Sequence, residues 1–245
     1  MNLRRVLARK GSLSRKALRL AGKYWLAWRY RNFSPDAGPT RYVRVAGLTL
    51  LVNPTVFNPR LHFTSRFFAE YIRRSRVVSG ADRVLDVGTG SGLLAISAAM
   101  AGARKVTAVD LNPAAVLAAR ANAAVYGLAA RVNVVQGDMF EPLRGERFDV
   151  ILCNPPYLRG EPTSQGTLAY FAGDDLGWLR RFSQGAVDHL NPRGRCLLAL
   201  TDSTDLATIL DIFRQDGWRV RPLAERDLIV ERLFITELNR RGGGS

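Results

Sequence analysis

The sequence feature that most constrains the fold is a glycine-rich turn after a short apolar run. Residues 83–92 read Arg-Val-Leu-Asp-Val-Gly-Thr-Gly-Ser-Gly, and a helical pattern of small residues follows at 93–101. Glycine lets the backbone approach a ligand closely and leaves N–H groups free to bind it. Gly88, Gly90 and Gly92 have G-x-G-x-G spacing, whereas dinucleotide-binding proteins have G-x-G-x-x-G. These residues predict a nucleotide-cradling unit, with an ordinary tight turn as the alternative.

Strand-like and helical segments alternate along the chain, which is typical of a parallel sheet covered by helices on both faces. Strands are expected at 83–87, 105–110, 132–136, 148–153, 196–201, 218–223 and 227–235. Helices are expected at 61–77, 93–101, 113–126, 175–190 and 204–215. Because no helix separates the last two strands, we expect them to pair in antiparallel fashion.

Polar residues follow the first four of these strands. The glycine turn follows the first strand, Asp110 the second, Asp138 the third, and Asn-Pro-Pro-Tyr at 154–157 the fourth. Ligands of a doubly wound sheet bind beyond the carboxyl ends of its strands, so these residues should line one crevice. Asp110 lies about twenty residues beyond the turn, where a carboxylate accepts hydrogen bonds from ribose hydroxyls. A helix N-cap is the alternative for Asp110.

The tetrapeptide at residues 154–157 suits group transfer to a planar nitrogen, whose delocalised lone pair makes it a poor nucleophile. The Asn154 side-chain carbonyl and the Pro155 backbone carbonyl can accept both hydrogens of an –NH2 group, which fixes the nitrogen for in-line attack. Pro155 and Pro156 stiffen the loop because they restrict φ. Tyr157 offers a flat face for stacking. A proline-rich turn that closes a buried strand is the alternative.

Together these motifs, at these spacings, resemble the class I S-adenosylmethionine (SAM)-dependent methyltransferases over roughly residues 55–240. More narrowly, the chain resembles the release factor glutamine methyltransferases and relatives that methylate exocyclic amino groups of nucleobases. The resemblance implies a Rossmann-like α/β fold, with a seven-stranded, mostly parallel sheet, helices on both faces and an antiparallel C-terminal strand. It also implies a cytoplasmic SAM-dependent N-methyltransferase with SAM as its cofactor.

The resemblance further implies which residues bind SAM. These are Asp86, Gly88, Thr89, Gly90, Gly92, Asp110, Leu111, Asp138, Met139 and Asn154. In the family pattern, the Asp138 carboxylate and the Met139 N–H would read the adenine edge. Asp86 would order the loop or reach the cofactor's ammonium group through water.

Catalytic and further binding roles follow from the same resemblance. Catalysis is expected at Asn154, Pro155 and Tyr157, and substrate binding at Asn154, Pro155, Pro156 and Tyr157. The segment that enters the helix at 61–77 borders the SAM pocket in the family. Thr64 or Arg66 could therefore touch the methionine carboxylate, with a capping or surface role as the alternative.

A glutamine amide and an adenine amino group present the same –NH2 on a planar carbon, so the tetrapeptide suits both. Residues 159–162 and 171–177 resemble segments of the glutamine-modifying family, although Ala172 replaces a glycine and an extra Asp precedes Leu176. We expect the acceptor to be a glutamine of a release factor or another translation protein. An adenine of RNA or DNA is the alternative, and a SAM-binding assembly or RNA-binding protein without turnover is a third hypothesis.

The net charge of +15 is concentrated near the N-terminus, where residues 1–31 hold ten of the 36 Lys and Arg residues and no acidic one. This extension has the spacing of a basic amphipathic helix. It could contact RNA or the ribosome, lie on a membrane, direct the chain to an organelle or pack on the catalytic domain. We expect a linker and β-hairpin at 32–60 in place of the family's helical N-terminal domain, the methyltransferase domain at 61–241 and a flexible tail at 242–245.

Cysteine and histidine usage gives no sign of a disulfide framework or a metal site. Cys153 and Cys196 lie in apolar strand-like runs, which favours buried free thiols in a reducing compartment. His62 and His189 have no partners at ligand spacing, so we expect no metal. The sequence contains no run of eighteen apolar residues, so we expect no membrane span.

Overall fold

The computed structural model describes residue 17, residues 39–228 and residues 231–240. The basic helix expected at 1–31, apart from Ala17, and the tail expected at 242–245 lie outside the described residues.

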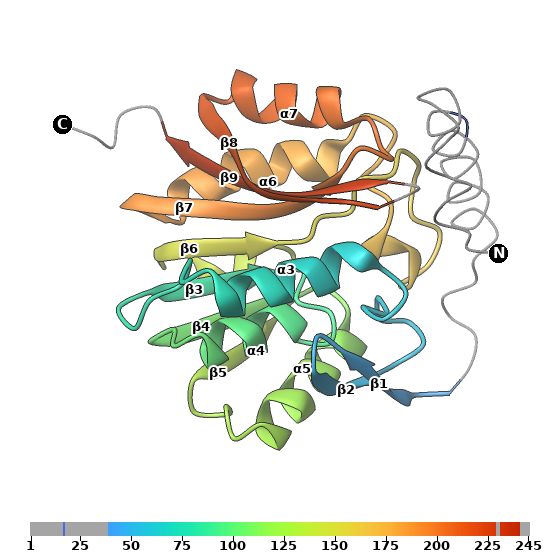
Figure 1. Cartoon of the computed structure of the whole chain (residues 1–245), viewed down its shortest axis with the longest axis vertical. Coiled ribbons are helices and arrows are strands. Elements are labelled where there is room, and N and C mark those ends of the chain that lie inside the picture. Colours follow the sequence, from blue (N-terminus) through green and yellow to red (C-terminus); the bar gives the residue numbers. More distant parts are fainter. Residues whose placement is uncertain (1–16, 18–38, 229–230, 241–245) are drawn as a thin grey trace, which may run out of the picture.

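A seven-stranded sheet in the order β5-β4-β3-β6-β7-β9-β8 forms the centre of the molecule (Figure 1). Its strands are β3 (Arg83–Val87), β4 (Lys105–Asp110), β5 (Val132–Gln136), β6 (Phe148–Cys153), β7 (Leu190–Thr201), β8 (Trp218–Asp227) and β9 (Arg232–Arg240). Neighbouring strands from β5 to β7 pair in parallel, and β9 pairs antiparallel with both β7 and β8. The expected Rossmann-like α/β fold with an antiparallel C-terminal strand is therefore confirmed.

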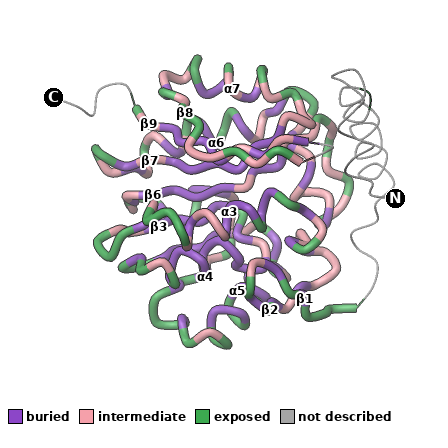
Figure 2. Tube along the Cα trace, viewed as in Figure 1, coloured by how far each residue is buried: buried purple, intermediate pink, exposed green. Residues whose placement is uncertain are grey.

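Helices cover both faces of this sheet, and each face has its own apolar core. Helices α3 (Phe63–Arg74), α4 (Leu93–Met100) and α5 (Pro113–Val125) pack on one face, and α6 (Gly177–Asp188) and α7 (Leu206–Gln215) pack on the other. Successive strand side chains point to opposite faces. Val84 thus joins the first core and Leu85 the second, and both are fully buried. Figure 2 shows the resulting buried centre of the sheet.

The predicted β-hairpin is present as β1 (Arg41–Val45) and β2 (Leu48–Val52), which pair antiparallel. Its apolar side chains belong to the same core as α3, α4 and α5. Asn122 of α5 ties the hairpin to the glycine-rich turn. Its side chain accepts from Leu51 N–H at 2.7 Å and donates to Leu51 O and Ser91 O, each at 2.9 Å. The hairpin thereby lies against the glycine-rich turn.

Two strands begin at residues well away from those predicted. The last strand begins at Arg232 rather than at 227, because Asp227 still belongs to β8. No glycine or proline marks that turn, which is closed by a 2.8 Å hydrogen bond from Leu228 N–H to Glu231 O. Strand β7 begins at Leu190 rather than at 196, although Pro192 and Gly194 lie within it. Its pairing with β6 is irregular between Phe148 and Val150, which accommodates these residues.

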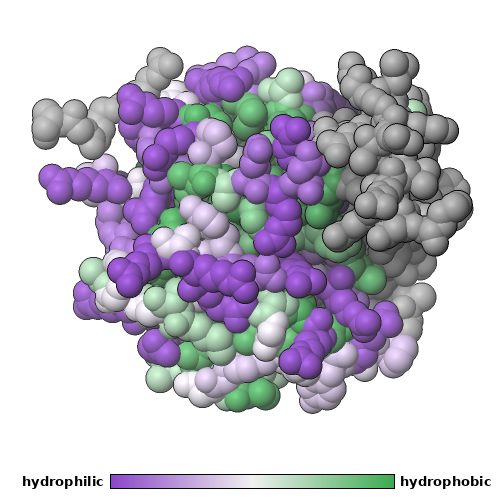
Figure 3. Space-filling view, viewed as in Figure 1, coloured by the Kyte–Doolittle hydropathy of each residue, from purple (hydrophilic) through white to green (hydrophobic). Residues whose placement is uncertain are grey.

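Cys153 and Cys196 are free and buried, as predicted. Within the described residues, no helix is long and apolar enough to cross a membrane, and no cluster of His, Cys, Asp and Glu could hold a metal ion. Hydrophilic side chains are spread among hydrophobic ones over the face seen in Figure 3.

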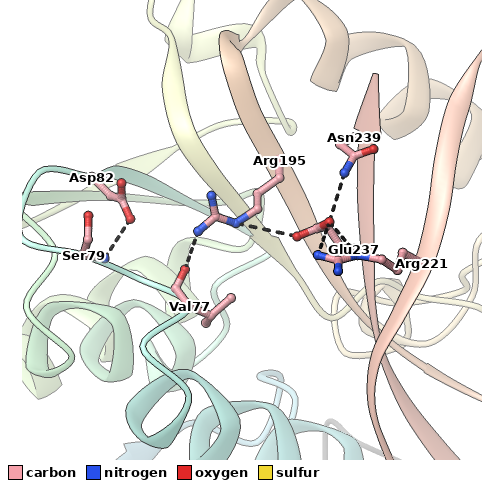
Figure 4. A network of polar contacts seen from close by, with 7 residues as sticks. All are labelled: Val77, Ser79, Asp82, Arg195, Arg221, Glu237 and Asn239. Carbon is pink, nitrogen blue, oxygen red and sulfur yellow. Dashed lines mark hydrogen bonds and ion pairs between the residues drawn. The ribbon is translucent and has the colours of Figure 1, made fainter. Parts of the chain in front are cut away.

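A buried glutamate joins the C-terminal strands to the rest of the sheet (Figure 4). Glu237 of β9 has only 7% of its side chain exposed and pairs with Arg221 of β8 at 2.9 Å. Its second oxygen lies 3.9 Å from Arg195 of β7. Arg195 also donates to the Val77 carbonyl, which follows α3, at 2.8 Å. One carboxylate therefore lies between two arginines, and Arg195 extends this network to the segment that follows α3.

We predict that Glu237→Ala lowers the free energy of unfolding by about 2 kcal/mol, because it leaves Arg195 and Arg221 without their shared carboxylate. The loss is smaller than for a fully buried pair because the Arg221 side chain is 62% exposed. Urea denaturation measures it. The control is Asp211→Ala, which removes an ion pair with Arg214 whose side chains are both more than half exposed and should cost about 0–0.5 kcal/mol. Equal effects of the two substitutions would contradict the structural role of Glu237.

Candidate active site

A cavity of about 380 Å³ lies at the carboxyl ends of β3, β4, β5 and β6. Small-molecule sites typically measure roughly 300–1,000 Å³. The predicted site residues that line it are Gly88, Thr89, Gly90, Asp110, Leu111, Asp138, Met139, Asn154 and Pro156. Asp86, Gly92, Pro155 and Tyr157 were also predicted, and they are not among its lining residues. Segments far apart in the sequence therefore meet at one site, as expected from the strand ends.

Asp110 holds the glycine-rich turn in place. Its carboxylate accepts hydrogen bonds from Gly90 N–H at 2.8 Å and from Asn112 N–H at 2.9 Å. Gly88 and Gly90 have φ angles of 70° and 56°, which glycine adopts without strain. Burial raises the pKa of Asp110. The N-cap of α5 is Asn112, whose side chain accepts from Ala114 N–H at 2.9 Å, so Asp110 is not the cap.

Asp86 lies beneath the turn rather than in the cavity. It is fully buried, and one carboxylate oxygen accepts from the Thr89 hydroxyl at 2.7 Å and from Ala95 N–H at 3.0 Å. Its other oxygen has no hydrogen-bond partner. Burial raises the pKa of Asp86 to about 7, and the nearby Asp110 carboxylate adds to the shift. The contacts fit the loop-ordering role that we predicted for Asp86.

Gly92 has a packing role. It precedes α4 with a φ of 85°. A Cβ at this position would lie 3.2 Å from both the Cα and the Cβ of Ala119 on α5. Glycine here allows α5 to pack closely against the start of α4.

Asp138 is paired with an arginine that the sequence did not indicate. Arg181 of α6 lies at the cavity wall, and its Nη1 is 2.6 Å from the Asp138 Oδ2. The adjoining Met139 lines the cavity with a φ of 47°, in the left-handed region that a side chain rarely adopts. Such backbone strain tends to persist at functional sites. The β5 strand end thus presents a carboxylate and a strained backbone to the cavity.

Asn154 presents an acceptor that nothing in the described chain uses. Its Nδ2 donates to the Ser65 Oγ of α3 at 3.0 Å. Its Oδ1 is buried and has no hydrogen-bond partner. An unpaired buried carbonyl costs roughly 1–3 kcal/mol, so such an atom calls for an explanation such as a ligand.

The other residues of the tetrapeptide differ in their surroundings. Pro155 and Pro156 are buried, and Pro156 contributes to the cavity wall. Tyr157 is half-buried and packs against the core formed with α6 and α7. The structure therefore does not bring the Tyr157 ring to the cavity, where we expected it to stack on the substrate.

Neither Thr64 nor Arg66 lines the cavity. Thr64 is buried and its hydroxyl has no partner, whereas Arg66 pairs with Glu70 at 2.8 Å. Ser65 between them reaches the cavity instead. The helix entry borders the site as expected, but through a different side chain.

Five further residues line the cavity and were not predicted from the sequence: Thr55, Phe57, Ser65, Trp178 and Arg181. None of them stands in a motif. Phe57 stacks on His62 with ring centroids 4.3 Å apart, and its ring lies 5.5 Å from that of Tyr170. This aromatic contact joins the loop before α3 to the loop after β6. Only the tertiary fold brings these segments together.

Comparison with known proteins relates this site to methyl transfer. A family model described as the methyltransferase small domain matches residues 47–215. A release factor glutamine methyltransferase of Geobacter sulfurreducens is 33% identical over 195 residues, and the match spans 74% of this chain and 66% of that protein. A tRNA1(Val) (adenine(37)-N6)-methyltransferase of Shewanella amazonensis is 42% identical over 90 residues, which are 36% of this chain and 39% of that protein.

Among solved structures, a T. thermophilus 16S rRNA methyltransferase in complex with AdoMet and guanosine aligns with a TM-score of 0.62. The alignment has 22% identity and covers 82% of this chain and 50% of that one. At this level of identity the likeness concerns the fold alone.

We predict that Asp86→Asn removes a pH-dependent component of stability. Folded wild-type protein keeps the Asp86 proton up to its pKa of about 7, whereas the unfolded chain loses it near the ordinary pKa of about 3.9. The wild-type unfolding free energy should therefore fall as the pH rises from 5 to 8, by about 2–3 kcal/mol relative to the variant. Urea denaturation across this range measures the difference. Asp188→Asn, an exposed site on α6, is the control, and parallel curves for Asp86→Asn and wild type would contradict the prediction.

Proposed function

We propose, from the premise that this chain belongs to the methyltransferase small domain family, that it methylates the side-chain amide nitrogen of a glutamine in a protein of the translation machinery. The family model matches residues 47–215, which contain the whole cavity-lining set. The chain is a SAM-dependent methyltransferase. The observation that carries the choice of a nitrogen acceptor is the buried, unpartnered Oδ1 of Asn154 at the cavity.

Three features of the cavity support the SAM contacts that we predicted. The Asp110 oxygens each accept one backbone N–H and keep a second lone pair for a ribose hydroxyl. Arg181 engages Oδ2 of Asp138, which leaves Oδ1 for an adenine amino group. The backbone of Gly88 and Gly90 lets the turn approach the cofactor closely.

When bound, SAM supplies a methyl group on a positively charged sulfur. The residues of this chain would do the rest by positioning. Asn154 Oδ1 accepts one N–H of the acceptor –NH2 and so holds the nitrogen for in-line attack. The Pro155 carbonyl, predicted to accept the other N–H, belongs to a residue outside the cavity lining. The Asn154 carbonyl also favours the positive charge that develops on that nitrogen. The proton can leave after transfer, so no strong general base is required.

Charge at the cavity wall favours a polypeptide over a nucleic acid. Glu161 and Asp175 line the cavity beyond the tetrapeptide, and the arginine of the same wall, Arg181, is already paired with Asp138. Phosphate groups bind mainly to free Lys and Arg, whereas these carboxylates repel them. The glutamine-modifying relative supports the same choice.

Adenine methylation is the second candidate, supported by the tRNA adenine methyltransferase relative. The Asn154 carbonyl serves an adenine –NH2 as well as it serves a glutamine. RNA or ribosome contact through residues 1–31 and a cytoplasmic location remain predictions.

One experiment separates these candidates. Purified protein is incubated with tritium-labelled SAM and with the separated protein and RNA fractions of a cell extract. Incorporation into protein, with N5-methylglutamine in the acid-free proteolytic digest, supports the proposal. Label in RNA alone would favour adenine, and the absence of both SAM binding and transfer would refute methyl transfer.

We predict that Asn154→Ala lowers the rate of methyl transfer by about 10²–10³-fold, the usual effect of removing one group that stabilises developing charge. SAM affinity, measured by calorimetry, should change little because the lost carbonyl faces the acceptor nitrogen. Asn133→Ala, at an exposed position of β5, should leave both quantities unchanged. A loss of SAM affinity equal to the loss of rate would instead favour the cofactor-binding role that the resemblance also implies for Asn154, and would contradict the positioning of the acceptor by its carbonyl.

A further inference from the structure

Charge is distributed unevenly between the helices that cover the two faces of the sheet. On one face, α3 and the turn after it (residues 63–77) contain four arginines and one acidic residue: Arg66, Arg73, Arg74, Arg76 and Glu70. On the opposite face, α7 with its two capping residues (residues 205–216) contains three aspartates and one arginine: Asp205, Asp211, Asp216 and Arg214. Helix α3 is therefore positively charged and α7 is negatively charged.

Strand β8 extends the positive charge beyond α3. On this face α3 packs against β7 and β9, and Arg221 of β8 reaches Glu237 of β9, whose second oxygen lies 3.9 Å from Arg195 of β7. Arg195 donates in turn to the Val77 carbonyl after α3, so Arg221 lies on the α3 side of the sheet (Figure 4). Arg219, two residues earlier in the same strand, points to the same side and, like Arg221, is exposed.

The acidic residues of this surface are shared between arginines or bound to the backbone. Glu70 accepts from Arg66 at 2.8 Å and lies 3.1 Å from Arg226 of β8, with only 13% of its own side chain exposed. Glu237 lies between two arginines in the same way. Asp82, which Figure 4 also labels, accepts a backbone N–H at 2.7 Å. The guanidinium groups therefore exceed the carboxylates, and 57% of the Arg66 side chain is exposed.

Helix stability accounts for only part of this charge. Arg73 and Arg74 lie in the last turn of α3, where a cation stabilises the negative end of the helix dipole. That reason does not apply to Arg219 and Arg221, which belong to a strand. Within the part of the chain that the structure describes, the side chains of Arg74, Arg76 and Arg219 make no hydrogen bond or ion pair. Their charges are available to a partner.

The chemistry of this surface suits a nucleic acid better than a protein or a lipid. The centre of a protein–protein interface is apolar and depleted of charge, and a helix that binds a membrane inserts apolar side chains. Among the described residues, the large hydrophobic side chains that are exposed include only Phe63 from α3 and none from β7, β8 or β9. Interfaces with nucleic acids are more polar and much more positively charged. Arginine also pairs with phosphate through two hydrogen bonds and stacks on bases.

We propose that this surface binds the phosphate backbone of single-stranded RNA. We call it the arginine face, and it consists of Arg66, Arg74, Arg76, Arg219, Arg221 and Arg226. None of these residues lines the cavity, so RNA bound here would hold the enzyme beside its protein substrate and would not enter the site of methyl transfer. The choice of RNA over DNA rests on the proposed function, because RNA is the polyanion of the translation machinery.

The test measures binding of the full chain to a fluorescein-labelled oligouridylate of about 20 nucleotides by anisotropy, from about 50 to 200 mM salt. In Arg74→Ala/Arg219→Ala, the slope of log K against log salt should become shallower by about 1.4, because each lost phosphate contact removes about 0.7. The control is Arg144→Ala/Arg180→Ala, which removes two exposed arginines. Arg180 lies on α6, and the residue before Arg144 packs in the core beneath α6. The control should keep the wild-type slope.

Three results would overturn the proposal. A wild-type slope in Arg74→Ala/Arg219→Ala would place any RNA binding elsewhere, for instance at residues 1–31. Equal losses in this variant and in the control would make the effect one of net charge alone. Oligoglutamate of the same charge and vesicles of phosphatidylserine and phosphatidylcholine are the comparison ligands. We expect both to bind more weakly than the RNA, because they offer no bases on which arginine can stack; equal or tighter binding would identify an acidic protein or a membrane as the partner.

Failure of this proposal is distinguishable from failure of the proposed function. RNA binding is measured without SAM and without methyl transfer, so a protein that methylates glutamine but shows no contribution of the arginine face refutes only the RNA surface. A protein that binds RNA through the arginine face but transfers no methyl group refutes only the proposed function.

Discussion

The site depends on the parallel pairing of β3 with β4 on one side and with β6 on the other. Parallel strands end at the same edge of a sheet, so this pairing places the glycine turn, Asp110 and Asn154 around one cavity. The hydrogen bond from Gly90 N–H to the Asp110 carboxylate then locks the ends of β3 and β4 together. Without this register, each motif would be an isolated turn.

The same arrangement explains why costly polar groups persist in the interior. Asp86 is fully buried with one oxygen unpaired, and it keeps Thr89 and Ala95 in place beneath the cavity. Asn154 Oδ1 is also buried and unpaired. Burying the unpaired oxygen of Asp86 costs free energy, but its partner oxygen maintains the shape of the turn. Burying the unpaired Oδ1 of Asn154 also costs free energy, but it keeps an acceptor open. The apolar cores on the two faces of the sheet make both of these costs tolerable, because packing on both faces fixes the positions of β3 and β6.

Features whose sequence signal is local were predicted from the sequence. The alternation of strands and helices, the glycine turn and the acids at strand ends are contiguous patterns, and strand geometry alone brings them together. Contacts that depend on the tertiary fold were not predicted. Ser65 and Arg181 lie 89 and 43 positions from Asn154 and Asp138 and belong to no motif. The β8–β9 turn was misplaced because no glycine or proline marks it. The position of Tyr157 outside the cavity lining follows from its packing against the core of α6 and α7, and its role stays a prediction.

Selectivity between glutamine and adenine has to arise outside the contact with Asn154, since both acceptors offer that carbonyl the same –NH2. The chain after β6 forms the remaining wall, where Glu161 and Asp175 carry negative charge and Phe171 and Trp178 offer apolar surface. A planar base attached to a phosphate backbone would bring negative charges toward these carboxylates, whereas the backbone of a polypeptide is uncharged. The Phe57 and Tyr170 contact holds this wall against the loop before α3. We therefore propose that the strand-end motifs position the nitrogen for methylation and that the charge of this wall favours a polypeptide as the molecule that carries it.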